Sequence, residues 1–100
     1  MTYMVKFNGK EYFYNYFKEM AERNGDELND KFCIEGNSGT LFGWLRNIAE
    51  QVGYENVSVD YNTYYVSTVN IDVSKAPKCS FSCNSDDTRY ANGVVSLWWD

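Results

Sequence analysis

The stretch Ser38–Val52, SGTLFGWLRNIAEQV, has the clearest periodic pattern in the chain and is followed by Gly53. Its apolar residues recur at the three- and four-residue spacing of a single helical face. We therefore predict an amphipathic helix that packs against a sheet, with Ser38 or Thr40 as its N-cap. The residues of its apolar stripe are Leu41, Phe42, Trp44, Leu45, Ile48, Ala49 and Val52.

Gly43 is the unusual residue of this predicted helix, because it falls on the polar face. A glycine inside a helix costs about 1 kcal/mol relative to alanine. A glycine at this position allows another backbone to approach closely, either from this chain or from a partner. The alternative is that the glycine has no structural role.

A second helix is predicted from about Glu11 to Arg23, because apolar residues recur at helical spacing through YFYNYFKEMA. Asn24-Gly25 is a plausible stop for it. Asn8-Gly9 is a strong turn signal, so the alternative is that Lys10–Tyr14 returns as the second strand of a hairpin.

Alternating apolar residues predict strands in the rest of the chain, and Asn84–Gly93, rich in Ser, Asp and Asn, is expected to be an exposed loop. In the longest strand we expect Tyr65, Val69, Ile71 and Val73 to face the core. Phe32–Ile34 is either a very short strand or a loop anchor. The predicted strands are Thr2–Phe7, Asn56–Tyr61, Tyr64–Val73, Cys79–Cys83 and Val94–Trp99.

The predicted element order is β-α-α-β-β-β-β, over one domain that spans residues 1–100. Successive strands joined by short turns form an antiparallel meander. The expected fold is therefore α+β, with an antiparallel sheet of four to five strands and two helices packed on one face.

Composition narrows the classes of function. The chain is 44% hydrophobic and 18% aromatic, which suits a compact core and a partner surface bearing tyrosines. Its net charge of −5 argues against direct binding to nucleic acid, which needs a basic surface. No apolar run is long enough to cross a membrane and no signal-peptide pattern is present, so a cytoplasmic location is expected.

The sequence gives little support for a catalytic or metal-binding site. The chain has no histidine, the commonest general base and metal ligand. Cys33, Cys79 and Cys83 are expected to be buried thiols rather than a zinc site. No cofactor is expected. A carboxylate-dependent hydrolase using Asp86 and Asp87 remains an alternative, although adjacent acids in a Ser-rich loop are usually solvated.

The acidic residues cluster in the first half of the chain, on the predicted first helix and the segment after it. Such a cluster produces a negative potential that can steer a basic partner; the alternative is an ordinary solvated helix face. We predict a partner-binding site made of Glu19, Glu22, Asp26, Glu27, Asp30, Glu35 and Tyr14.

The resulting profile is that of a small, acidic, aromatic-rich interaction protein without enzymatic activity. It is similar in composition to phage and mobile-element inhibitors of host defence, such as anti-CRISPR and anti-restriction proteins. That similarity implies stoichiometric binding to a basic, nucleic-acid-handling host protein, with local mimicry of nucleic acid. The alternative is a structural or assembly protein that forms homodimers through an edge strand in the terminal VVSLWWD, residues 94–100.

Overall fold

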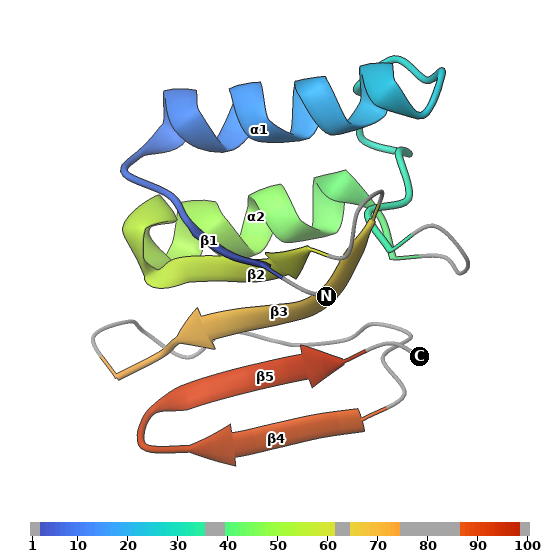
Figure 1. The fold of residues 1–100 in the computed structure, drawn as a ribbon. Helices are drawn as coiled ribbons and strands as arrows, with labels where there is room; N and C mark the ends of the chain where they lie inside the picture. Colours follow the sequence, from blue (N-terminus) through green and yellow to red (C-terminus); the bar gives the residue numbers. More distant parts are fainter. Residues whose placement is uncertain (1–2, 36–39, 62–64, 75–86, 99–100) are drawn as a thin grey trace.

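The computed structural model describes residues 3–35, 40–61, 65–74 and 87–98. Two helices and a five-stranded antiparallel sheet confirm the predicted α+β class and the order β-α-α-β-β-β-β (Figure 1). None of the helices in these ranges has the length and apolar composition needed to span a membrane. The elements are β1 (Tyr3–Lys6), α1 (Lys10–Arg23), α2 (Phe42–Val52), a short 3₁₀ turn (Tyr54–Asn56), β2 (Val57–Tyr61), β3 (Val66–Asp72), β4 (Asp87–Ala91) and β5 (Val94–Trp98).

Helix α1 confirms the predicted helix and begins at Lys10, so the alternative hairpin strand over Lys10–Tyr14 is wrong. Its buried residues are apolar and recur with helical period, which is why this segment coils rather than extends. They are Phe13, Phe17, Met20 and Ala21.

Helix α2 begins at Phe42, later than predicted, and its N-cap is Leu41, whose side chain makes no capping hydrogen bond. Thr40 is therefore not the cap, and Ser38 lies outside the described residues. In place of a capping side chain, the backbone carbonyl groups of Asp30 and Phe32 accept hydrogen bonds from the first amides of α2. The amide of Phe42 donates to the carbonyl oxygen of Phe32 at 2.8 Å, which satisfies a donor that has no partner within the first turn of the helix.

The strand order is β1-β2-β3-β5-β4, so the predicted meander is wrong at its end. Strand β5 lies between β3 and β4, and the edges of the sheet are β1 and β4. The predicted edge over residues 94–98 is therefore an interior strand. The predicted strand Cys79–Cys83 lies outside the described residues.

Strand β4 occupies part of Asn84–Gly93, which was predicted to be a loop. Asn92 and Gly93 have φ values of 54° and 79°, as the two central residues of a tight hairpin turn require. All residues of β4 are exposed, so the segment lacks the apolar alternation that normally identifies a strand.

An irregularity in the pairing of β2 with β3 decides which residues of β3 face the core. Asp60 lies opposite Thr68, whereas Tyr61 lies opposite Val66, so β3 contains one extra residue. This shift buries Val66 and leaves Tyr65, predicted to face inward, only half-buried. The prediction for Val69 and Ile71 is confirmed, because both are fully buried.

The core lies between the sheet and the two helices, which Figure 1 shows on the same side of the sheet. Aromatic rings join α1 to α2: the ring centroids of Phe13 and Phe42 are 5.6 Å apart, and those of Phe17 and Phe42 are 5.5 Å apart. Strand β4 lies farthest from the helices. The α2 residues buried in this core are Phe42, Gly43, Leu45, Ile48, Ala49 and Val52.

Candidate functional site

The end of α1 places the predicted acidic residues. Asn24 is the C-cap, Gly25 follows with φ of 76°, and the amide of Asp26 donates to the carbonyl oxygen of Ala21 at 2.8 Å. A second bond joins the amide of Gly25 to the carbonyl oxygen of Glu22. This pair of bonds is a Schellman motif, which turns the chain back against the last helical turn.

Four carboxylates are exposed around this turn, and we call them the acidic surface: Glu19, Glu22, Asp26 and Glu27. Within the described residues, none of the four forms an ion pair. Glu22 lies in the last turn of α1, and Asp26 and Glu27 follow just beyond it, where the helix dipole is negative and disfavours anions by about 0.3–1 kcal/mol each. Glu19 lies one turn earlier. Their placement thus does not serve the stability of the helix.

The acidic surface borders an open depression of about 490 Å³. Beside Asp26 and Glu27, its lining includes one cation, Lys31, and two aromatic residues, Phe32 and Tyr65. The thiol of Cys33 also lines it, and its pKa is raised by burial and then by the negative charges of Glu35 and Asp26. The depression is therefore a region of negative potential with an aromatic wall. Tyr65 was not predicted here, because its pattern indicated a core residue.

Three of the seven predicted site residues are not part of this surface. Glu35 is buried, with 6% of its surface exposed, although it was expected on the exposed acidic cluster. Tyr14 is half-buried between the helices, where its ring meets the ring of Phe42 at a centroid distance of 5.5 Å. Asp30 is exposed but forms an ion pair with Arg46 of α2.

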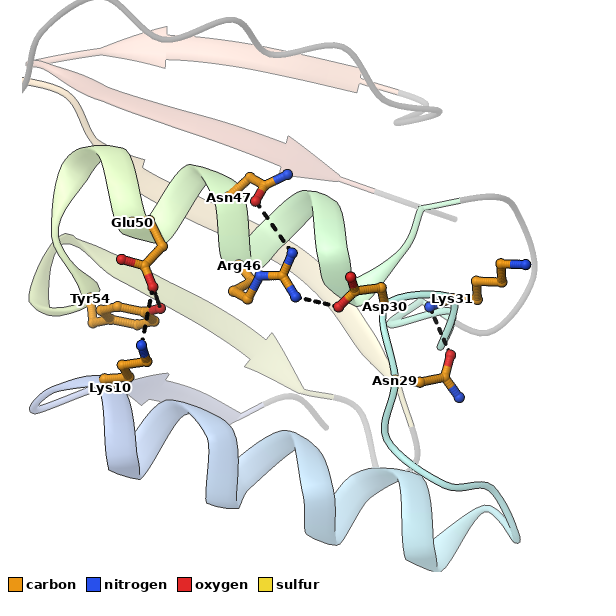
Figure 2. Close-up of polar contacts among 8 residues, drawn as sticks. All are labelled: Lys10, Asn29, Asp30, Lys31, Arg46, Asn47, Glu50 and Tyr54. Carbon is orange, nitrogen blue, oxygen red and sulfur yellow. Dashed lines mark hydrogen bonds and ion pairs between the residues drawn. The ribbon is translucent and has the colours of Figure 1, made fainter.

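Asp30 belongs to a set of polar contacts along the outer side of α2 (Figure 2). Its pairing with Arg46, by a hydrogen bond first and charge attraction second, raises the pKa of the guanidinium. One helical turn later, the carboxylate of Glu50 accepts a 2.6 Å hydrogen bond from Tyr54 and lies 3.4 Å from the ammonium nitrogen of Lys10. These contacts hold the start of α1 and the segment after α1 against α2, so they are structural.

The contact with Asp30 explains why residue 43 is a glycine. Gly43 is buried rather than exposed on a polar face. A methyl group added there would lie 3.0 Å from Cβ of Asp30 and 3.1 Å from its carbonyl oxygen. The backbone that approaches Gly43 is thus this chain's own.

The alternatives with catalytic or metal chemistry gain no support. Within the described residues, no three His, Cys, Asp or Glu side chains lie close enough to hold a metal ion. Cys79, Cys83 and Asp86 lie outside those residues. Asp87 is exposed on β4 and pairs with Arg89, with 3.1 Å between Oδ2 and Nε.

Comparison with known proteins gives no match to any protein family, to any curated protein or to any solved structure.

Proposed function

We propose that this protein is a stoichiometric binding module whose acidic surface docks on a basic, nucleic-acid-binding groove of another protein. The observation that supports the proposal is the gathering of four exposed carboxylates, none of them in an ion pair within the described residues, on the last two turns of α1 and the segment after it. Charges that oppose the helix dipole cost stability, so a binding role accounts for them better than folding does.

The adjoining depression suits a cationic side chain of the partner. Asp26 and Glu27 supply negative charge, and the ring of Tyr65 supplies a surface over which a guanidinium or ammonium group can stack. Arginine fits best, because its planar group both stacks on rings and forms paired hydrogen bonds with a carboxylate.

The mimicry of nucleic acid in this proposal is local. Duplex DNA carries about one charge per 1.7 Å of helix axis, whereas the net charge of the whole chain is −5. The acidic surface therefore covers a few phosphate positions of a groove rather than its full length. Within the proposal, the protein acts in the cytoplasm as a phage or mobile-element inhibitor of a host defence nuclease or effector complex, without catalysis.

Affinity capture from bacterial lysates with and without competing duplex DNA tests the proposal. The native chain is expected to retain a nucleic-acid-binding protein that DNA displaces. Reversal of two charges of the acidic surface, Glu22→Lys with Asp26→Lys, is expected to abolish this retention.

The matched control reverses two exposed acids outside the acidic surface, Glu11→Lys with Glu55→Lys. Both double variants change the net charge from −5 to −1, so they differ in the position of the charge and not in its amount. Equal loss in both variants, or retention that DNA does not compete with, would contradict the proposal.

A further inference from the structure

The face of the sheet that lies away from the helices carries polar side chains. Val69 of β3 is fully buried in the core, so its neighbours Thr68 and Asn70 point to the opposite face. The strand registers place Asp60 of β2 beside Thr68, and Ser96 of β5 beside Asn70. Figure 1 shows both helices on the other side of the sheet. Hydrogen-bonding groups therefore lie side by side on this face.

An open depression of about 480 Å³ lies on this face. Its centre is lined by the short side chains of Thr68, Asn70 and Ser96. The longer side chains of Trp98 and Arg89 flank this centre, because Trp98 lies beside Thr68 in the sheet and Arg89 lies beside Ser96. Every side chain of the lining is half-buried or exposed, so the depression is open to solvent.

A second depression, of about 200 Å³, adjoins the first, because Asn70 lines both. It extends along β3 to Asp72. From Thr68 to Asp72 the strand rises about 13 Å. We call the two depressions together the sheet groove, and its length suits an extended ligand.

The sheet groove offers both donors and acceptors of hydrogen bonds. The hydroxyl of Ser96 donates to Oδ1 of Asn70 at 2.7 Å, which leaves the amide nitrogen of Asn70 as a donor. Nε of Arg89 donates to Oδ2 of Asp87 at 3.1 Å, which leaves the terminal guanidinium nitrogens as donors. Asp60 adds a carboxylate that forms no ion pair with any side chain in the described ranges.

The composition of the sheet groove favours an uncharged ligand. The carboxylates of Asp60 and Asp87 repel an anion such as a phosphate, and the guanidinium of Arg89 repels a cation. A neutral ligand with many hydroxyl groups avoids both repulsions, and each hydroxyl both donates and accepts. Trp98, 43% exposed, adds an apolar ring on which the C–H face of a sugar can pack. Neutral saccharides combine these two properties.

We propose that the sheet groove binds a short neutral oligosaccharide. One sugar ring packs on Trp98, and the hydroxyl groups form hydrogen bonds with Asp60, Asn70 and Arg89. The groove lies on the opposite side of the sheet from α1, so a bound saccharide leaves the acidic surface free. The inference therefore does not depend on the proposed function.

NMR titration of the full chain tests the proposal, with maltotriose, cellotriose, triacetylchitotriose and lactose as probes. At least one probe is expected to shift the indole resonance of Trp98 and the amide resonances of Asn70 and Ser96, with saturation in the millimolar range. The corresponding monosaccharide is expected to bind more weakly, because it fills only part of the groove. L-Arginine and inorganic phosphate serve as a cation and an anion, and neither is expected to shift these resonances.

Two variants remove groups of the sheet groove, and a third is their matched control. Trp98→Ala and Asp60→Ala are each expected to weaken saccharide binding about tenfold. Tyr90→Ala removes an exposed aromatic ring from β4, where Tyr90 lies opposite Val95 and hence on the other face of the sheet. This control is expected to bind like the native chain.

Circular dichroism of each variant checks that it is folded. The proposal would be overturned if none of the four saccharides shifted the resonances of the sheet groove, or if a trisaccharide bound no better than its monosaccharide. Unchanged affinity in Trp98→Ala and Asp60→Ala, or an equal loss in Tyr90→Ala, would also overturn it. Tighter binding of L-arginine or phosphate at the same resonances would show a site for ions instead.

Discussion

The amide of Gly43, in the first turn of α2, donates a 3.0 Å hydrogen bond to the carbonyl oxygen of Asp30. The side chain of Asp30 in turn accepts a hydrogen bond from Arg46, one turn further along the same helix. Asp30 thus fixes the segment that follows the acidic surface to α2 at two points. This explains both the glycine in α2 and the absence of Asp30 from the acidic surface.

We expect Gly43→Ala to destabilise the protein by about 1–2 kcal/mol. Alanine favours a helix by about 1 kcal/mol over glycine, but the added methyl group would lie 3.1 Å from the carbonyl oxygen of Asp30. Overpacking of a fixed contact costs about 1–3 kcal/mol, and the bond from Gly43 would lengthen as the segment moved. Urea unfolding measures the change in the free energy of unfolding, with Gln51→Ala on the exposed side of α2 as control. A Gly43→Ala variant that is more stable than the native chain would show that the segment around Asp30 moves to accommodate the methyl group.

The ion pair of Asp30 with Arg46 is expected to contribute modestly to the free energy of unfolding. The side chain of Asp30 is 62% exposed, and exposed pairs contribute about 0.2–1 kcal/mol. A double-mutant cycle with Asp30→Asn and Arg46→Gln should give a coupling energy in this range. Asp30→Asn should also leave partner capture unchanged, because Asp30 is not part of the acidic surface. Loss of capture in this variant would place Asp30 in the binding site.

Glu50 should make the protein sensitive to acid. The hydrogen bond from Tyr54, and then the charge of Lys10, lower the pKa of Glu50 from its ordinary value of 4.5. Since the pKa is lower in the folded state, the stabilisation is present above pH 4.5 and is lost as the pH falls through the folded-state pKa. In Tyr54→Phe, NMR titration should show a Glu50 pKa closer to 4.5, and the melting temperature should fall less at acid pH. An unchanged Glu50 pKa would show that Tyr54 does not donate to it.

Two tyrosines should make the protein sensitive to alkali. Burial raises the pKa of Tyr16 and of Tyr54, and the hydrogen bond to Glu50 adds to the effect for Tyr54. A folded-state pKa above the unfolded value means that stability is present below pH 10 and is lost as the pH rises beyond it. Thermal melts between pH 8 and pH 11 should therefore fall less steeply in Tyr16→Phe than in the native chain. Parallel curves would contradict this assignment.

Tyr16→Phe should also stabilise the protein at neutral pH, by about 1 kcal/mol. The Tyr16 hydroxyl is buried and has no hydrogen-bond partner within the part of the chain that the structure describes. A buried polar group without a partner costs about 1–3 kcal/mol, and phenylalanine keeps the ring while removing it. Tyr54→Phe is the matched control: it removes a hydroxyl that has a partner, so it should destabilise. A loss of stability in Tyr16→Phe would indicate a partner for its hydroxyl, such as an ordered water.

Local sequence patterns determined the helices and most of the strands. The apolar residues of α1 and α2 recur with helical period, and Val57 and Val59 of β2 alternate, because one face of each element must be buried. The exposed carboxylates Glu19, Glu22, Asp26 and Glu27 were also found from sequence, since charged residues around a helix end rarely lose their water.

Strand β4 shows where local pattern fails. Its residues are exposed on both faces, so nothing in DTRYA distinguishes a strand from a loop. The one available signal was Asn92-Gly93, the dipeptide that most favours a two-residue hairpin. The place of β5 between β3 and β4 depends on pairing between distant segments, and local periodicity carries no information about it.

The sequence by itself determined a small acidic α+β protein, its two amphipathic helices and a cluster of acids after the first. Only the tertiary structure decided which acids are available. Glu35 is buried and Asp30 is paired with Arg46, because the segment after α1 folds back to supply hydrogen-bond acceptors to the start of α2. Those acceptors are backbone carbonyl groups, which every residue has, so no residue type in the sequence reveals the contact.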